Sequence, residues 1–312
     1  MATKSTKGTK HFSGRAWPGI GYVWLLLFVW TALKAETITI ATYNVQNYGL
    51  ADRMVEGTFR QAYPKPETEK KALRAVIRTL DADVIALQEI GPKSFLEELQ
   101  RDLAADGVKY PYAELLEAAD EERHVAILSR RPFASVGRHT DLTFSYFKTK
   151  EPVKRGLLEV RFKMESGELT LFVVHLKSRF TDRDDDPLSA QRRLGEAVAV
   201  RDRVLKLFPE PTKARFILMG DCNDSGASRP LRSLMKRGEA EIFQRVPATD
   251  SRGEVWTHFY RKEQTYSAVD HVLISPALKT AVVTGTATIC DSSEVLEASD
   301  HRPVVVKLKW EK

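Results

Sequence analysis

The sequence has little cysteine, no internal repeat and no low-complexity tract. Its two cysteines, Cys222 and Cys290, are too few for a disulfide-stabilised scaffold, so we expect two separate, partly buried thiols. A Pro-, Gly- or Ser-rich linker is also absent from the middle of the chain, which argues against a domain boundary there. With 43% hydrophobic residues among 312, residues 36–312 can form one sizeable globular domain.

Acidic residues are absent from the first 35 positions, whereas five of the 48 basic residues fall there. Residues 36–312 therefore carry 43 basic against 42 acidic side chains, and the formal net charge of +6 belongs mainly to the leader. Composition alone does not argue for a polyanion partner of the folded domain.

No apolar run reaches the roughly 20 residues that a membrane-spanning helix needs. The longest one, Ile20–Leu33, follows a basic segment and precedes Ala35. This order is typical of a secretory signal peptide that is cleaved near Ala35. An uncleaved N-terminal membrane anchor is the second interpretation, and a buried helix is the third. In the first two cases we expect an exported domain, periplasmic or extracellular, that starts near Glu36.

Runs of apolar and β-branched residues predict the strands, and apolar residues at helical spacing predict the helices. The predicted strands cover residues 37–44, 83–89, 123–128, 155–162, 169–175, 216–218, 269–275 and 304–308. The predicted helices cover residues 66–80, 93–103, 187–208 and 231–236. We expect residues 46–49 to form a polar loop, residues 155–175 to form a hairpin, and Trp256 to anchor a loop-rich segment.

Polar side chains recur where the predicted strands begin or end. They are Asn44, Glu89, His175, Asp221, Asn223, Asp270, Asp300 and His301. Glu89, helped by Asn44 and Asp300, can hold a hard cation such as Mg²⁺ or Mn²⁺ through oxygen ligands. Such a cation can polarise a phosphoryl oxygen.

The remaining members of the set can attack a phosphoester. Asp221 can orient or deprotonate a water molecule, while Asn223 and His175 can donate hydrogen bonds to phosphate oxygens. His301, held by Asp270 or Asp300, can act as a general acid or base or as a cationic stabiliser. Taken singly, each residue is as well explained as a turn former, a helix cap or a buried histidine. The joint pattern is what favours catalysis.

Seven blocks of sequence span residues 37–310 in a fixed order. They are T-Y-N-V-Q-N (42–47), L-Q-E (87–89), V-A-I-L-S-R (125–130), V-V-H-L-K-S (173–178), M-G-D-C-N-D (219–224), A-V-D-H-V-L-I-S (268–275) and S-D-H-R-P-V (299–304). In order and spacing they resemble the endonuclease/exonuclease/phosphatase superfamily. That superfamily includes deoxyribonuclease I-like nucleases, apurinic-site endonucleases, inositol polyphosphate phosphatases and neutral sphingomyelinases.

The resemblance implies an α/β fold, a four-layer sandwich of two mixed β-sheets packed face to face with helices on the outside. The active site then lies at one end of the sandwich, where the strands stop. The resemblance also implies that Glu89 is the principal metal ligand, with Asn44 beside it. Asp221 and Asn223 match the pair that orients the nucleophilic water and the phosphate.

The resemblance assigns the histidines as well. His301 with Asp270 resembles the catalytic histidine and its carboxylate partner, and Asp300 resembles a further metal or histidine-orienting group. His175 and Arg155 match positions that contact the phosphate. Lys177 can also contact the substrate, although basic residues near it are equally well explained as surface charges.

Two departures from the family pattern stand out. Cys222 replaces an apolar residue, a change that leaves the ligands untouched. His271 follows Asp270 where the phosphatase branch favours Arg, which argues against an inositol phosphatase.

The sequence therefore predicts an exported, Mg²⁺- or Mn²⁺-dependent phosphoesterase that hydrolyses phosphodiester bonds in a nuclease-like manner. We expect a monomer whose partner is a phosphoester substrate such as nucleic acid. One alternative is a phosphatase or phospholipase C-type hydrolase acting on a lipid or small-molecule phosphoester. The other is a non-catalytic binding module on the same fold.

Overall fold

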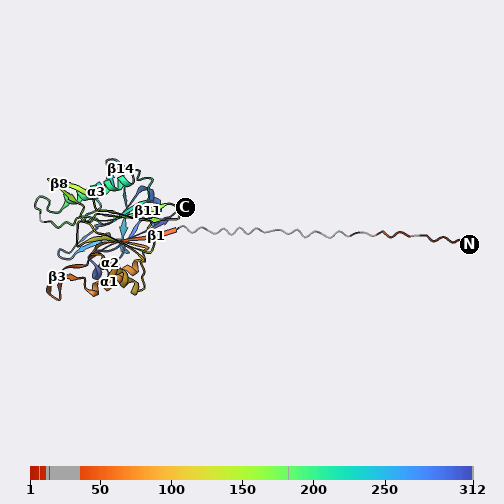
Figure 1. Cartoon of the computed structure of the whole chain (residues 1–312), viewed down its shortest axis with the longest axis horizontal. Coiled ribbons are helices and arrows are strands. Elements are labelled where there is room, and N and C mark those ends of the chain that lie inside the picture. The colour runs from red at the N-terminus through yellow and green to blue at the C-terminus, as the bar shows by residue number, and fades with distance from the viewer. Residues whose placement is uncertain (7, 12–13, 15–35, 182, 311–312) are drawn as a thin grey trace. The chain divides into compact units, whose positions relative to one another are not determined.

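The computed structural model describes residues 1–6, 8–11, 14, 36–181 and 183–310. The chain divides into two compact units, Met1–Lys34 and Ala35–Lys312, and the second contains the elements described below (Figure 1). The apolar run expected to be a signal peptide or anchor lies outside the described residues. Among the helices formed by described residues, none is both long and apolar enough to cross a membrane.

Two mixed β-sheets form the centre of the second unit. The strands of the first sheet are β1 (Glu36–Tyr48), β4 (Val84–Ile90), β5 (Tyr112–Leu116), β6 (His124–Ser129), β16 (Ala248–Thr249), β20 (Ala287–Ile289) and β21 (Val304–Trp310). Their order is β16-β20-β21-β1-β4-β6-β5. The strands of the second sheet are β7 (Ser135–His139), β10 (Leu157–Lys163), β11 (Glu168–His175), β12 (Phe216–Asp221), β15 (Gln244–Arg245) and β19 (Asp270–Ile274). Their order is β15-β19-β12-β11-β10-β7.

Helices cover the outer face of each sheet. They are α1 (Glu67–Leu80), α2 (Lys93–Ala105), α3 (Ala190–Leu207), α4 (Arg229–Met235) and α5 (Val295–Ala298). The 3₁₀ helices η1 (Pro276–Ala281) and η2 (Val283–Gly285) instead follow β19, and Leu278 of η1 joins the core between the two sheets. In Figure 1, α1 and α2 lie on one side of the sandwich and α3 lies on the other. In α1 the apolar residues Leu73, Val76, Ile77 and Leu80 recur at helical spacing and are buried, as the sequence predicts.

The remaining strands form small hairpins. They are β2 (Leu50–Val55) with β3 (Thr58–Pro64), β8 (Thr143–Tyr146) with β9 (Thr149–Pro152), β13 (Lys236–Arg237) with β14 (Ala240–Glu241), and β17 (His258–Tyr260) with β18 (Thr265–Ser267). Trp256, the expected anchor, lies just before β17. The guanidinium carbon of Arg302 lies over its indole ring, 4.0 Å from the ring centre.

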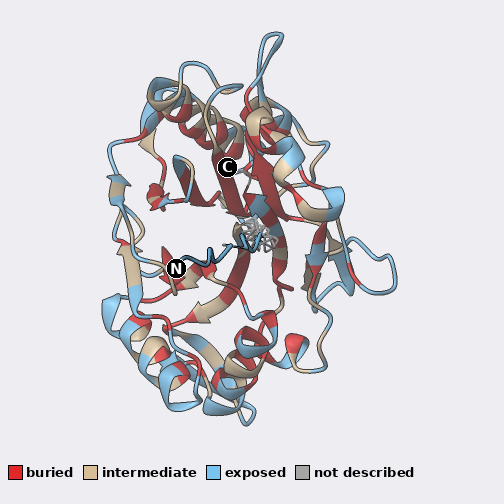
Figure 2. Ribbon diagram, turned by 90° about the vertical axis from the view of Figure 1, so that its right-hand side faces the viewer, coloured by how far each residue is buried: buried red, intermediate tan, exposed pale blue. Residues whose placement is uncertain are grey.

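Alternating side chains divide the buried residues into three apolar layers. Ile38 and Ile40 of β1 point into the core between the two sheets, whereas Ala41 and Tyr43 join the layer that α1 and α2 cover. A third layer packs α3 and α4 on the second sheet. Figure 2 shows this distribution, with buried residues concentrated on the sheets and exposed ones on the outer helices and loops. The predicted four-layer sandwich is confirmed.

One local prediction is wrong. Residues 46–49 were expected to form a polar loop after Asn44, but β1 continues to Tyr48 and its pairing with β4 shifts register between Asn44 and Tyr48. Gln46 and Asn47 have positive φ angles, 47° and 49°, within this irregular stretch. The bulge keeps the strand paired while it turns polar groups toward the neighbouring strand end.

Candidate active site

Sheet register brings the candidate residues of the second sheet together. β11 and β12 are parallel and end at His175 and Asp221, which are paired in register. β19 runs antiparallel to β12 and begins at Asp270, which pairs with Asp221. His175, Asp221 and Asp270 therefore form one row across three neighbouring strands at the same edge of the sheet.

The first sheet contributes Asn44 and Glu89 from the parallel strands β1 and β4. Asn44 Nδ2 donates to Asp221 Oδ2 at 3.0 Å and to Glu89 Oε1 at 3.3 Å, so this amide links the two sheets. Its Oδ1 accepts a hydrogen bond from Gln46 N at 3.0 Å. The structure thus places Asn44 between two carboxylates, while its ligation of a cation stays a prediction.

Glu89 occupies a strained backbone position. Its φ is 62°, at a register shift between Gln88 and Ile90 in the pairing of β4 with β6. A non-glycine residue in this region costs roughly 1–3 kcal/mol, and such strain is concentrated at functional sites. Asn47 N donates to Glu89 Oε2 at 3.0 Å, which fixes one carboxylate oxygen.

His301 and Asp270 form a buried pair. The Nδ1 of His301 lies 2.8 Å from Asp270 Oδ2, and its Nε2 lies 3.8 Å from Asp221 Oδ2. Although burial lowers the pKa of His301, the charges of Asp270 and Asp221 outweigh burial and raise that pKa well above its usual value. The imidazole is therefore held as a cation, with Nε2 facing the site.

Asp221 lies at the centre of the constellation. Asn223 N donates to its Oδ1 at 2.8 Å, and Asn223 Nδ2 donates to its Oδ2 at 3.1 Å. Burial raises the pKa of Asp221 to about 7, and the negative charges of Asp270 and Glu89 add to the rise while His301 opposes it. Near neutral pH this carboxylate can therefore accept a proton.

His175 is buried beside the same carboxylates, with Nε2 at 3.5 Å from Asp221 Oδ2 and 3.8 Å from Glu89 Oε1. Burial lowers the pKa of His175 well below its usual value, and the positive charges of Arg155 and His301 act in the same direction. A neutral imidazole can donate one hydrogen bond to a phosphate oxygen.

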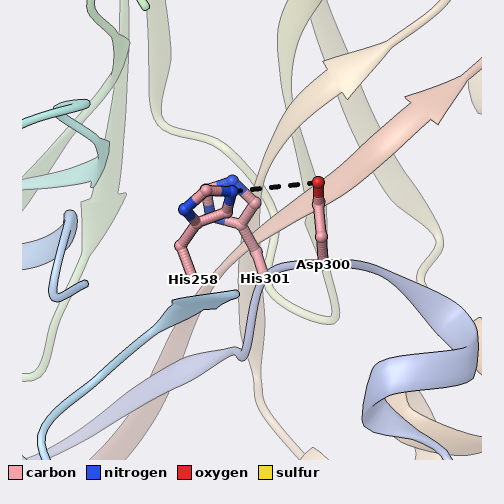
Figure 3. Close-up of side chains that lie close together, drawn as sticks. All are labelled: His258, Asp300 and His301. Carbon is pink, nitrogen blue, oxygen red and sulfur yellow. Dashed lines mark ion pairs between the residues drawn. The ribbon is translucent and has the colours of Figure 1, made fainter. Parts of the chain in front are cut away.

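Asp300 lies farther out, next to a residue that the sequence did not single out. Its Oδ2 is 3.8 Å from Nε2 of His258, whose ring lies against that of His301 at an angle of 40° (Figure 3). Asp300 N donates to Gln46 Oε1 at 3.0 Å. His258 lies in the segment expected to be loop-rich, and no periodicity or motif there distinguishes it.

Arg155 and Lys177 lie outside the carboxylate cluster but share a cleft with Glu89 and His175. The cleft has a volume of about 690 Å³ and is lined by charged residues of both signs, the basic Arg123, Lys154, Arg155 and Lys177 and the acidic Glu89, Asp120, Glu121 and Glu122. Burial lowers the pKa of Lys177 to about 8, and neighbouring Arg155 and Arg192 contribute. The predicted substrate-binding residues thus lie in a groove that opens directly from the site.

The donor set fits a divalent cation. Glu89, His175 and Asp221 have ligand atoms within 4.8 Å of one another, as do Asp221, Asp270 and His301. Burial raises the pKa of Asp300, and Glu89 contributes to the rise. Several acids thus destabilise one another's charge here, and a bound cation would relieve that repulsion. The predicted ligands Glu89 and Asp300 do not fall in the same one of these groups.

Comparison with known proteins places this geometry in a family. The sequence matches the Endonuclease/Exonuclease/phosphatase family over residues 41–301. A search of curated protein sequences finds no match.

Several solved structures share the fold. The endonuclease/exonuclease/phosphatase from Bacteroides vulgatus is 13% identical, with a TM-score of 0.61 over 88% of this chain and 100% of that one. Beta toxin from Staphylococcus aureus is 13% identical, with a TM-score of 0.60 over 86% and 99%. Sphingomyelinase C from Streptomyces griseocarneus is 16% identical, with a TM-score of 0.59 over 88% and 100%. At these identities the likeness shows the fold alone. On the family match, the chain belongs to the Endonuclease/Exonuclease/phosphatase family, whose members are typically phosphoester hydrolases.

Proposed function

We propose that this protein is a divalent-metal-dependent phosphodiesterase of the nuclease type. The observation that carries the proposal is the convergence of Glu89, His175, Asp221 and the Asp270–His301 pair at one end of the sandwich. These side chains supply what phosphoester hydrolysis requires: ligands for a cation, a base for water and donors for the phosphate.

Asp221 is the proposed base, because its pKa near 7 lets it take a proton from water at neutral pH. Asn223 and Asn44 hold its two oxygens in place. His301 faces the same position with a positive charge that offsets the charge developing on the phosphoryl oxygens. A cation bound at Glu89 would polarise the phosphoryl group further.

The adjoining cleft is lined by charges of both signs, but some of its basic side chains offer donors for phosphate groups. Arg155 is buried beside Asp120, with Nε 2.8 Å from Oδ2, and its Nη1 has no hydrogen-bond partner among the described residues. Lys177 and Arg123 line the same groove. Flanking phosphates of a nucleic acid would satisfy these donors, which supports a nuclease-like reaction.

A lipid phosphodiester is the second candidate. The hairpin β2–β3 exposes Met54 and Phe59, which are 67% and 62% accessible and pair across the strands. Arg53 of the same hairpin donates to Asn47 O at 2.5 Å, so the hairpin is joined to the site. An exposed apolar hairpin suits a lipid surface, and one structural relative is a sphingomyelinase C.

A substrate panel separates these candidates. The purified full chain is incubated with plasmid DNA, RNA, sphingomyelin vesicles and an inositol phosphate in Mg²⁺, Mn²⁺ or EDTA. We expect nucleic acid to be cleaved with either metal and not in EDTA. Cleavage of sphingomyelin alone would move the proposal to the lipid, and inertness toward every substrate would support a binding module.

We also propose that the protein is exported. This proposal rests only on the composition of residues 1–35.

A further inference from the structure

His258 is a titratable side chain at the active site for which the proposed reaction has no use. Its ring centroid lies 4.5 Å from that of His301, and its Nε2 lies 3.8 Å from Asp300 Oδ2 (Figure 3). One ligand atom from each of the three residues lies within 4.8 Å of the others. We propose that His258, Asp300 and His301 form a second metal site, which takes a transition-metal cation such as Zn²⁺.

The distance between His258 and Asp300 is close to that between two ligands of a zinc site. Zinc binds nitrogen and oxygen ligands at about 2.0–2.2 Å, which puts neighbouring ligands of a tetrahedral site about 3.3 Å apart. The 3.8 Å between His258 Nε2 and Asp300 Oδ2 must therefore shorten by about half an ångström. Rotation of the half-buried His258 ring supplies such a change, because its side chain is 23% accessible.

The donor types separate this site from the one at Glu89. Two imidazoles and one carboxylate suit zinc and its transition-metal neighbours, whereas Mg²⁺ prefers a set of oxygen ligands. Glu89 and Asp221 supply such oxygens in a group that includes neither His258 nor Asp300. The active site thus offers two sets of ligand atoms that suit different cations. At the His258 site the three protein ligands leave the fourth position of a tetrahedral zinc ion open.

Both ligand histidines already have a hydrogen-bond partner on the ring nitrogen that would not bind the metal. Asp270 Oδ2 holds Nδ1 of His301 at 2.8 Å, so Nε2 is the nitrogen that can bind a metal, which replaces the proton on it. This is the carboxylate–histidine–metal arrangement that orients the ligand and raises its basicity. His258 Nδ1 faces Ser267 Oγ at 3.4 Å, so the second ring also presents Nε2.

The backbone presets the positions of the ligands. His258 and His301 pair as an isolated antiparallel bridge, and Phe259 N donates to Asp300 O at 2.9 Å. The three ligands therefore lie on two adjacent segments that are hydrogen-bonded to each other. A site on such a framework needs little reorganisation when a cation binds.

Occupation of this site has a consequence for turnover that rests on the proposed function. A metal on His301 Nε2 removes the cationic nitrogen that faces the phosphate beside Asp221. Zinc is therefore an inhibitor of the Mg²⁺-dependent reaction, although it binds through ligands that Mg²⁺ does not favour.

Cobalt(II) provides a direct test, because it replaces zinc and reports its ligands by visible absorption. The full chain is titrated with Co²⁺ in excess Mg²⁺, and Zn²⁺ is then added to displace it. We expect one Co²⁺ per chain with absorption bands that Zn²⁺ abolishes. His258→Gln should weaken Co²⁺ binding by at least about tenfold, because it removes a ligand.

Glu89→Gln is the matched control, since it alters the oxygen-rich site alone. It should lose Mg²⁺-dependent turnover and keep the Co²⁺ bands. The opposite pattern, or no Co²⁺ binding by the wild type in excess Mg²⁺, would overturn the metal site. Unaltered Co²⁺ binding with no turnover on any substrate would instead count against the proposed function.

A second variant guards against a folding defect in His258→Gln. His258→Cys keeps a metal ligand and replaces nitrogen with a thiolate, which zinc-type sites also accept. A new thiolate-to-cobalt charge-transfer band, absent from the wild type, is expected. A folded His258→Cys variant that binds Co²⁺ without this band would show that residue 258 is not a ligand.

Discussion

The imidazole of His301 and the carboxylate of Asp270 form a buried ion pair in which Nδ1 lies 2.8 Å from Oδ2. Strand β19 fixes the carboxylate, and the segment before β21 fixes the ring. The pair sets both the tautomer and the charge of the nitrogen that faces Asp221.

Replacement of Asp270 by Asn should therefore damage catalysis without large structural change. The amide has nearly the same shape but cannot stabilise a cationic ring, so we expect kcat to fall by about 10²–10⁴. Steady-state kinetics on a small phosphodiester measure the loss. Asp141→Asn, at an exposed aspartate paired with Arg203, is the matched control and should retain the wild-type rate.

The pH dependence should follow Asp221. Since the pKa of this carboxyl is about 7, its basic form grows as pH rises, and kcat/KM should increase roughly tenfold per unit below pH 7 before levelling off. The raised pKa of His301 keeps that ring charged over the same range. A cation at Glu89 should shift the rise to lower pH. A profile with no rise at any pH below 7 would exclude Asp221 as the base.

Metal binding should depend on Glu89. A ligand that binds only the folded state raises the free energy of unfolding, by about 2.7 kcal/mol at 100 times its Kd. We expect Mg²⁺ or Mn²⁺ to raise the melting temperature of the wild type, and Glu89→Gln to lose most of this increase together with turnover. Glu97→Gln, at a surface residue near Lys93, should behave as the wild type. An equal metal-induced shift in both variants would contradict the assignment.

Substitution of Gly220, the glycine of the M-G-D-C-N-D block, should destabilise the fold. Gly220 has φ +143°, and a Cβ there would lie 2.0 Å from the carbonyl oxygen of Val174 on the neighbouring strand. We expect Gly220→Ala to cost roughly 2–4 kcal/mol in unfolding experiments because the backbone of β12 must move. Gly253→Ala, at φ +83° in open space, isolates the conformational cost and should lose only about 1 kcal/mol.

Lys177 should matter for polymeric substrates. Its ammonium lies in the cleft beside Arg155 and donates to Ser178 Oγ at 3.1 Å. Lys177→Ala should raise KM for DNA by roughly tenfold at low salt and flatten the salt dependence, since one phosphate contact is lost. A small phosphodiester should be turned over as by the wild type, and so should DNA by the exposed-site control Lys150→Ala. Equal losses on both substrates would contradict a role in binding flanking phosphates.

The sequence predicted the central strands because they are buried on both faces. Phe216–Leu218 of β12 and residues 84–87 of β4 are continuous apolar runs, which only a sheet centre or a buried helix tolerates. The hairpin β2–β3 carries no such signal. Every residue of Thr58–Pro64 is exposed, so this strand needs no alternation of apolar and polar residues. Its strands are defined by hydrogen bonds that composition does not reveal.

The sequence also predicted that the candidate site residues lie close together, because polar residues at the ends of neighbouring buried strands lie at the same edge of a sheet. His258 lacked such a signal. Its position depends on the packing of Trp256 on Arg302 and on a backbone bridge to His301, which are tertiary relationships. The bulge after Asn44 also depends on tertiary contacts, since Gln46 and Asn47 take up their positive φ angles to reach Asp300 and Glu89.

The amide of Asn44 spans the gap between the sheets at their catalytic end, where it joins Glu89 of one to Asp221 of the other. Apolar contact, which tolerates sliding more readily than a directional bond does, fills the space between the sheets. At the opposite end, Trp310 Nε1 donates to Ser166 O at 2.9 Å and Glu165 N donates to Glu36 Oε2 at 3.0 Å. Directional bonds therefore fix the mutual alignment of the two sheets at both ends, and at the catalytic end they are made by the candidate catalytic side chains themselves.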